Sequence, residues 1–257
     1  LIVNNLKKKK EKFIIVDISK KKLFKKFKNS NSLSIGELGK CINILKKNLC
    51  KRILFAGRVE RPNFKKIKFD YKAFYHLPKI IKETKKGDAY IIKFITSLFE
   101  KEGFKILDQT HFNPEIVLKK GIYTKQKINQ NYFKDISIGK KIINNLRLKG
   151  VEQGVIVVKG KVVLPENFKG TDFMLKKAKK KLNKVISKKN RAGILLKFPK
   201  PNQDLRTDLP TIGINTLKNC AKLGLKGIVL KANYNLFIDR KKCLKIADKN
   251  KMFITAI

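Results

Sequence analysis

The residues best suited to chemistry gather in one segment, residues 197–213, which holds three of the seven prolines of the chain. It follows a strand-like run, Gly193–Lys197, and precedes a helix-like run, and α/β proteins place sites on such loops. Its polar side chains are Lys197, Lys200, Gln203, Asp204, Arg206, Thr207, Asp208 and Thr211. A carboxylate, an arginine and hydroxyls lie beside apolar residues here. This favours a functional loop over a surface turn that only faces water.

A second group of polar residues precedes the predicted helix 174–186. Thr171 and Asp172 stand just before that helix, and Glu152, Gln153 and Glu166 lie upstream of them. A helix N-terminus is a natural anion site, whereas an N-cap role for Thr171 or Asp172 is the simpler alternative. Magnesium usually takes one or two carboxylates plus substrate phosphates. Asp172 and Asp208 both lie in loops next to helices, which suits a shared metal.

A third group, Phe55–Pro62, ends a predicted strand and contains Gly57, Arg58 and Arg61. Arginine is much rarer than lysine in this chain, so its use here suggests that the guanidinium makes a bidentate contact that lysine cannot make. An ordinary surface arginine is the alternative. The two histidines stand alone, without the serine or cysteine partner that a catalytic triad needs.

The elements that must position these residues read as two α/β patterns. The first half alternates predicted strands and helices, which implies parallel strands in a Rossmann-like layer: 13–16, 36–48, 52–56, 88–101 and 104–107. Residues 123–133 are polar and aperiodic and read as a linker. The second half combines a hairpin around Gly160 with further strands and helices, which predicts a mixed sheet: 136–148, 155–158, 162–164, 174–186, 193–197, 216–223, 227–230, 235–238, 241–248 and 252–255.

Composition excludes several classes of protein. The chain has 257 residues, 42% of them hydrophobic, which is enough for ordinary cores and argues against disorder throughout. The four cysteines are scattered, so a zinc cluster or a disulfide framework is not expected and a reducing cytoplasm fits. No signal peptide and no apolar run of about 18 residues is found.

The charge balance is extreme, with 63 lysines and arginines against 19 aspartates and glutamates, a formal net charge of +44. Lysine, isoleucine and asparagine are all abundant, as AT-rich codons produce, and the lysine blocks are spread along the chain. We therefore interpret most of the surplus as a solvated lysine surface. The alternative is a non-enzymatic protein that binds anionic lipid, nucleotide or nucleic acid.

The motifs, taken together and in order, resemble those of the LpxI-type UDP-2,3-diacylglucosamine pyrophosphatases over essentially the whole chain. They are residues 36–40, 55–62, 86–88, 99–104, 152–155, 170–175 and 197–213. The resemblance implies a lipid A pathway hydrolase that cleaves UDP-2,3-diacylglucosamine to lipid X and UMP with Mg²⁺ or another divalent cation. It also implies a cytoplasmic enzyme bound peripherally to the inner membrane, with no specific nucleic acid partner.

The same resemblance implies the domain plan and the site. A Rossmann-like N-terminal domain is expected over 1–122, a linker over 123–133 and a distinct α/β catalytic domain with a mixed sheet over 134–257. Asp208, Thr207 and Arg206 are the expected catalytic residues, and Asp208 and Asp172 the expected metal ligands. The expected substrate-binding residues are Gly57, Arg58, Gln153, Thr171, Lys197, Lys200, Gln203 and Thr211.

One departure from the family pattern concerns the start of the chain. Family members open with a strand and a glycine-rich loop, whereas this sequence begins at Leu1 in what reads as the following helix. We therefore expect an N-terminally incomplete copy, and a catalytically inactive lipid-binding remnant is a third alternative.

Overall fold

A computed structural model describes the chain except residues 20, 58–62, 146–151, 183–185, 188 and 202. The chain forms two compact units. Unit 1 consists of Leu1–Asn113 with Arg206–Asp208, and unit 2 of Pro114–Leu205 with Leu209–Ile257. The division falls after Asn113 rather than after residue 122, because residues 121–122 pair with the last strand of unit 2. The polar stretch 123–133 thus belongs to unit 2.

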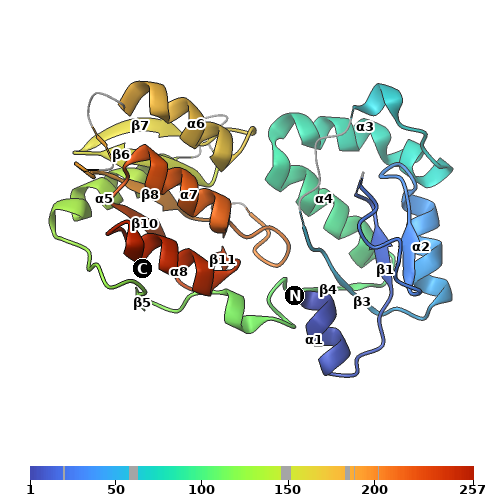
Figure 1. The fold of residues 1–257 in the computed structure, drawn as a ribbon. Coiled ribbons are helices and arrows are strands. Elements are labelled where there is room, and N and C mark those ends of the chain that lie inside the picture. The colour runs from blue at the N-terminus through green and yellow to red at the C-terminus, as the bar shows by residue number, and fades with distance from the viewer. Residues whose placement is uncertain (20, 58–62, 146–151, 183–185, 188, 202) are drawn as a thin grey trace. The chain divides into compact units, whose positions relative to one another are not determined.

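Unit 1 alternates short strands with helices, as predicted (Figure 1). Its elements are α1 (Ile2–Lys8), β1 (Ile15–Asp17), β2 (Ser30–Ser32), α2 (Leu38–Lys47), β3 (Arg52–Leu54), the 3₁₀ turn η1 (Phe64–Lys66), α3 (Tyr71–Lys86), α4 (Asp88–Lys101) and β4 (Lys105–Leu107). β1 pairs with β2 and β3 pairs with β4, and both pairs are parallel. Residues from α2, α4 and β4, among them Ile42, Phe99 and Ile106, form its core.

Helix α3 did not show in the sequence pattern. Its N-terminus is capped by Asp70, whose side chain accepts a hydrogen bond from the amide of Ala73 (2.9 Å). Pro78 lies inside the helix, and a proline normally ends or kinks one because it lacks the amide donor. Ala73 is the buried residue of α3, and the apolar residues of the helix stand on both sides of this proline.

Unit 2 is built around a six-stranded sheet in the order β5-β12-β10-β8-β6-β7. β8, β10 and β12 are parallel, whereas β5 and the β6–β7 hairpin bring antiparallel pairings, so the sheet is mixed as expected. Its elements are η2 (Pro114–Ile116), β5 (Gly121–Ile122), α5 (Asn131–Asn144), β6 (Gly154–Val158), β7 (Lys161–Pro165), α6 (Thr171–Leu182), β8 (Ile194–Lys197), β9 (Thr211–Ile212), α7 (Ile214–Leu223), β10 (Gly227–Leu230), β11 (Leu236–Phe237), α8 (Arg240–Lys249) and β12 (Phe253–Ala256).

Helices cover both faces of this sheet. Along β6, Val155 and Val157 pack with α5 on one face, while Ile156 and Val158 pack with α6 and α7 on the other, as the two-residue period of a strand requires. Figure 1 shows α6, α7 and α8 next to one another over the sheet. With both faces covered, the loops at the strand ends are where polar side chains can gather.

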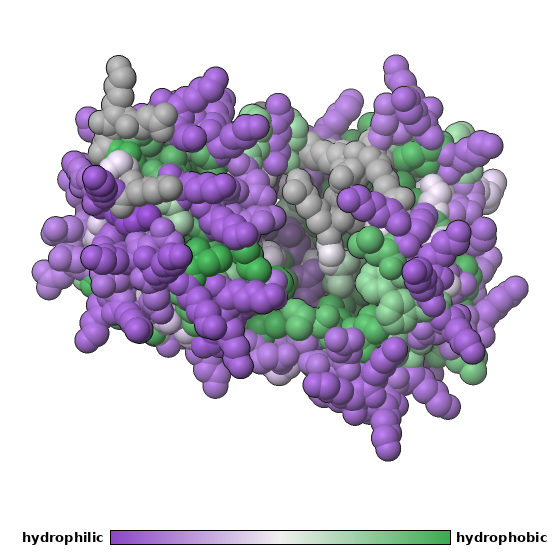
Figure 2. Space-filling model, in the orientation of Figure 1, coloured by the Kyte–Doolittle hydropathy of each residue, from purple (hydrophilic) through white to green (hydrophobic). Residues whose placement is uncertain are grey.

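The exterior agrees with the charge balance. Figure 2 shows hydrophilic residues over most of the drawn face and hydrophobic ones in smaller patches. Among the described helices, none combines the length and the apolar character that a membrane crossing demands.

Candidate functional site

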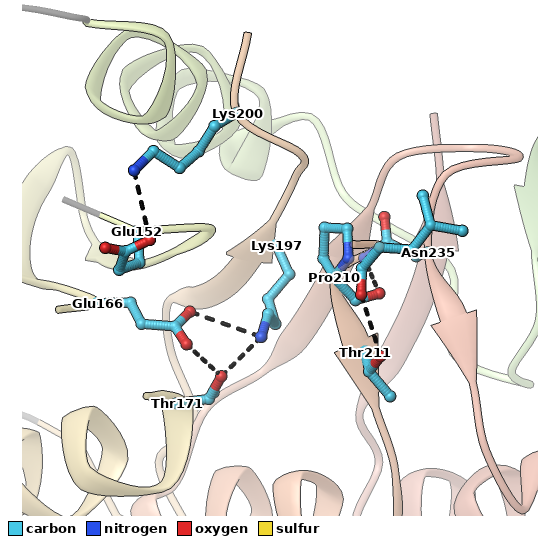
Figure 3. A network of polar contacts seen from close by, with 9 residues as sticks. Glu152, Glu166, Thr171, Lys197, Lys200, Pro210, Thr211 and Asn235 are labelled. Carbon is cyan, nitrogen blue, oxygen red and sulfur yellow. Dashed lines mark hydrogen bonds and ion pairs between the residues drawn. The ribbon is translucent and has the colours of Figure 1, made fainter. Parts of the chain in front are cut away.

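A polar network in unit 2 joins the ends of three elements. Lys197 is the last residue of β8, Thr171 is the first of α6, and Glu166 directly follows β7. Lys197 Nζ donates to Thr171 Oγ1 (2.7 Å), and that hydroxyl donates to Glu166 Oε1 (2.8 Å). Lys197 Nζ also lies 3.5 Å from Glu166 Oε2, completing the triangle in Figure 3.

This triangle is almost closed to solvent. The side chain of Lys197 is 5% exposed and that of Glu166 is 8% exposed. Buried charges of opposite sign need each other, because either alone would carry its full desolvation cost. The hydroxyl of Thr171 is both donor and acceptor, so its orientation is fixed by two charged groups rather than by an N-cap bond.

A second ion pair ties the start of the 197–213 loop to the residues before β6. Lys200 Nζ lies 3.3 Å from Glu152 Oε2 (Figure 3). The backbone amide of Lys200 donates to Gln203 Oε1 (2.9 Å), and the amide of Phe198 donates to the carbonyl of Gln153 (2.9 Å). Five predicted substrate-binding residues of unit 2 are thus brought to one end of the sheet: Gln153, Thr171, Lys197, Lys200 and Gln203.

The remaining residue of that set, Thr211, is the first residue of β9, just before α7. Thr211, Gly213 and Thr216 line a depression of about 420 Å³ that also contacts Asp239. The buried Asn235 holds the residue just before Thr211, because the side-chain amide of Asn235 donates to the carbonyl of Pro210 (3.3 Å). Glycine at the N-cap supplies no side chain to the first amides of α7. The first amides of α7 thus donate no hydrogen bond to an N-cap side chain.

The expected catalytic residues, Arg206–Asp208, belong to unit 1, where Gln109 binds them. The amide of Gln109 donates to the carbonyl of Arg206 (2.8 Å), and its side-chain Nε2 donates to the carbonyls of Thr207 (2.6 Å) and Phe55 (3.2 Å). Thr207 and Gln109 are both buried. Gln109 thus connects two of the predicted groups: the 197–213 segment through Thr207, and the 55–62 segment through Phe55, close to Gly57.

The other predicted residues of unit 1 are more exposed. Arg206 forms an ion pair with Glu100 (2.6 Å), with side chains 43% and 41% exposed. Asp208 is partly buried, and Gly57 is exposed with a φ of 91°. Arg58 lies outside the described residues.

The carboxylates suit a magnesium ion that the substrate completes rather than a dedicated protein cage. No three His, Cys, Asp or Glu side chains form a metal-binding group among the residues with described positions. In unit 2, Glu152 and Glu166 are matched by lysine ammonium groups. Asp172 is exposed and receives the Asn219 amide on Oδ1 (3.1 Å). A single carboxylate of this kind fits an ion that also binds phosphate oxygens.

One buried thiol near this end of α6 and α7 is excluded as a nucleophile. Burial raises the pKa of Cys220, and the Asp172 carboxylate raises it further, while Lys197 opposes the shift. Since the thiolate is the reactive form, Cys220 has no nucleophilic role.

Three residues of these networks were missing from the site expected from sequence: Gln109, Glu152 and Glu166. Gln109 follows β4 as the 197–213 loop follows β8, so the same strand-end signal points to it. Glu152 and Glu166 carried a signal too, because acidic residues are scarce in this chain.

Comparison with known proteins identifies the family to which these motifs belong. The family model of the LpxI C-terminal domain matches residues 119–255, and that of the LpxI N-terminal domain matches residues 1–116. The chain belongs to the LpxI family. It is 33% identical over 226 residues to the UDP-2,3-diacylglucosamine pyrophosphatase LpxI of Caulobacter vibrioides, an alignment covering 88% of this chain and 81% of that protein.

Membership in the LpxI family confirms the expected resemblance and the α/β, two-domain class. The two family models adjoin at residues 116 and 119, close to the division after Asn113. The roles of the individual site residues stay predictions. So does the shared metal, whose expected ligands belong to different units, Asp208 to unit 1 and Asp172 to unit 2.

Proposed function

We propose that this protein is a hydrolase that cleaves the pyrophosphate of UDP-2,3-diacylglucosamine to lipid X and UMP in lipid A synthesis. The observation that carries the proposal is the 33% identity, over 88% of the chain, to a protein named for that activity. The buried polar networks around Glu166 and Gln109 support it, since buried polar groups are costly and such networks hold side chains in fixed positions.

In unit 2, the chain's own residues supply anion binding. The first amides of α7 and the ammonium of Lys200, whose side chain is 26% exposed, are suited to phosphoryl oxygens. The ammonium of Lys197 is too buried to contact the substrate freely. Together with Glu166 it orients the hydroxyl of Thr171. To bind a phosphoryl oxygen, the Lys200 ammonium would share or exchange its contact with Glu152.

In unit 1, Gln109 fixes the backbone of Arg206 and Thr207, and Asp208 follows them directly. Leu209 and Pro210 after it stiffen the same loop. We assign to Asp208 the role of base for the attacking water or ligand of the cation, with Asp172 as a second ligand. A bound divalent cation would polarise the phosphoryl oxygens and lower the pKa of a bound water.

We further propose that the protein works in the cytoplasm at the surface of the inner membrane. The proposed substrate carries two acyl chains and resides in a lipid phase, and the cationic exterior is attracted to anionic headgroups. Acyl chains need apolar surface as well, for which the partly exposed residues of 77–81 and 91–95 are candidates.

The test is hydrolysis of UDP-2,3-diacylglucosamine by the purified full-length protein, followed as release of UMP and lipid X with Mg²⁺ and after chelation with EDTA. Asp208→Asn is expected to lower kcat at least ~10²-fold, the low end for loss of a general base. The free energy of unfolding should stay near that of the wild type. Chelation should abolish turnover, and re-addition of Mg²⁺ should restore it.

A matched control removes a carboxylate of unit 1 from an exposed ion pair. Glu11→Gln loses only its contact with Arg52 (3.4 Å) and should leave kcat unchanged. Near-normal turnover of Asp208→Asn, or failure of that variant to fold, would contradict the role given to Asp208. If the wild type has no hydrolytic activity but binds nucleic acid with a steep salt dependence, the binding-protein alternative replaces the enzyme.

A further inference from the structure

The first two turns of α3 expose three aromatic side chains on one face. Tyr71 is 88% exposed, Phe74 65% and Tyr75 72%. Their spacing of three and four residues places them next to one another on the helix surface. Ala73, on another side of the helix, is buried at 2%. The aromatic face therefore points away from the core of unit 1.

Such a cluster calls for an explanation, because exposed apolar side chains on soluble proteins are normally scattered singly. The other exposed aromatic residues include Phe133 on α5 and Phe168 in the loop between β7 and α6, both in unit 2. In the described part of unit 1, α3 gathers three within five positions.

Lysines continue the same helix. Four lysines of α3 are exposed: Lys79, Lys82, Lys85 and Lys86. The acidic residue of the helix, Glu83, forms an ion pair with Lys86, whose Nζ lies 2.8 Å from Glu83 Oε1. At helical spacing, Lys82 extends the line of Tyr71, Tyr75 and Pro78. The exposed side of α3 thus passes from aromatic to cationic along its length, with no acidic side chain beyond Glu83.

This arrangement matches the chemistry of a bilayer surface. Aromatic rings settle at the level of the headgroups, and lysines contribute by attraction to anionic lipid and by extending their apolar stems along it. A nucleic acid would also attract the lysines, but it needs a groove along which bases stack. A convex helix face suits a flat partner better.

We propose that α3 docks unit 1 on an anionic lipid bilayer, with Tyr71, Phe74 and Tyr75 entering the headgroup layer and Lys79, Lys82 and Lys85 lying over it. The inference deepens the proposed function and rests on it for its purpose, since docking would bring the enzyme to a lipid-embedded substrate. Binding itself is measured without that activity.

The test is co-sedimentation of the full-length protein with vesicles of phosphatidylcholine, with or without 30% phosphatidylglycerol. Replacing Tyr71, Phe74 and Tyr75 with alanine is expected to weaken binding to the anionic vesicles at least ~10-fold. Alanine is the best helix former, so α3 should be retained. The control, Phe133→Ala with Phe168→Ala, removes exposed aromatic rings from unit 2 and should change binding less than ~2-fold.

A second pair of variants tests whether vesicle binding depends on the lysines of α3 or on the overall positive charge of the protein. Lys79, Lys82 and Lys85 changed to glutamine should weaken vesicle binding much more than the same change at Lys176, Lys177 and Lys180, which are exposed on α6. Equal losses from the two sets, or wild-type binding by the aromatic variant, would overturn the proposal. The proposal would also be overturned if the α3 variants lost binding to an oligonucleotide but still bound the vesicles like the wild type.

Hydrolysis of substrate dispersed in detergent keeps the two proposals distinguishable. The aromatic variant should hydrolyse the dispersed substrate like the wild type and lose activity on substrate held in anionic vesicles. A wild type without any hydrolysis would refute the proposed function and leave the vesicle measurement of docking intact.

Discussion

A methyl group added at Gly154 should break the buried network of unit 2. Gly154 is the first residue of β6, and a Cβ there would lie 2.2 Å from Glu166 Oε2. Real atoms do not approach so closely, so the carboxylate of Glu166 must move. Its neighbours are Lys197 and Thr171, and both would lose their partner.

The expected cost follows from those contacts. A hydrogen bond to a charged group contributes about 1.5–3 kcal/mol, and breaking a buried ion pair by removing one partner costs about 3–5 kcal/mol. Gly154→Ala displaces the carboxylate without deleting it, so water can solvate part of its charge. We expect the free energy of unfolding to fall by about 3 kcal/mol.

Urea denaturation of four proteins measures this directly: the wild type, Gly154→Ala, Glu166→Ala and the double variant. Glu166→Ala removes the atoms with which the new methyl collides, so adding Gly154→Ala to it should cost little. The two changes are therefore expected to be non-additive by about 2–3 kcal/mol, well above the usual ~0.5 kcal/mol scatter for independent sites.

Gly139 of α5 provides the matched control. A Cβ there would contact Val155 and Leu196, both apolar, at 3.2 and 3.4 Å. Gly139→Ala combined with Glu166→Ala should be additive. Additive costs for the Gly154 pair would refute the role given to the close approach of Gly154 and Glu166.

Two further measurements check other parts of the structure. Gln109→Leu removes the donors to Phe55 and Thr207 and should lower kcat ~10-fold with a smaller effect on KM, measured on dispersed substrate; an unchanged kcat would show that Gln109 does not position Asp208. Burial raises the pKa of Cys243 to about 11 and also raises that of Cys220. Both thiols should therefore resist a thiol reagent at pH 8 in the native protein and react only after unfolding; fast native labelling of either would contradict the packing.

Elements with a clear apolar period were predictable from the sequence. The helix predicted over 88–101 is α4, the hairpin around Gly160 is β6 and β7, and Gly224 ends α7 in the left-handed conformation with a φ of 87°. Helix α6 begins at Thr171, before the predicted start, and its predicted end includes residues 183–185, outside the described part of the chain. Helix α3 was not predicted, because Pro78 lies inside it and a proline normally ends or kinks a helix.

The sequence indicated some residues of the polar networks but not how they pair, and their roles in a site stay predictions. Lys197, Lys200 and Gln203, from the start of the loop, do lie with Gln153 and Thr171 at one end of the sheet. No spacing rule indicates that Glu166 closes that network or that Gln109 holds Thr207, because both contacts join residues far apart in the chain. Long-range partners of this kind are set by the tertiary fold alone.

The insertion of Arg206–Asp208 into unit 1 makes the two units inseparable as genetic pieces. A fragment ending at Asn113 would keep Gln109 but lack the carbonyls to which its amide and Nε2 donate. The complementary fragment would keep Asp208 but lack the glutamine that holds the preceding turn. We therefore expect that a chimaera which replaces the N-terminal segment of this chain must exchange Arg206–Asp208 with it, although the two are far apart in the sequence.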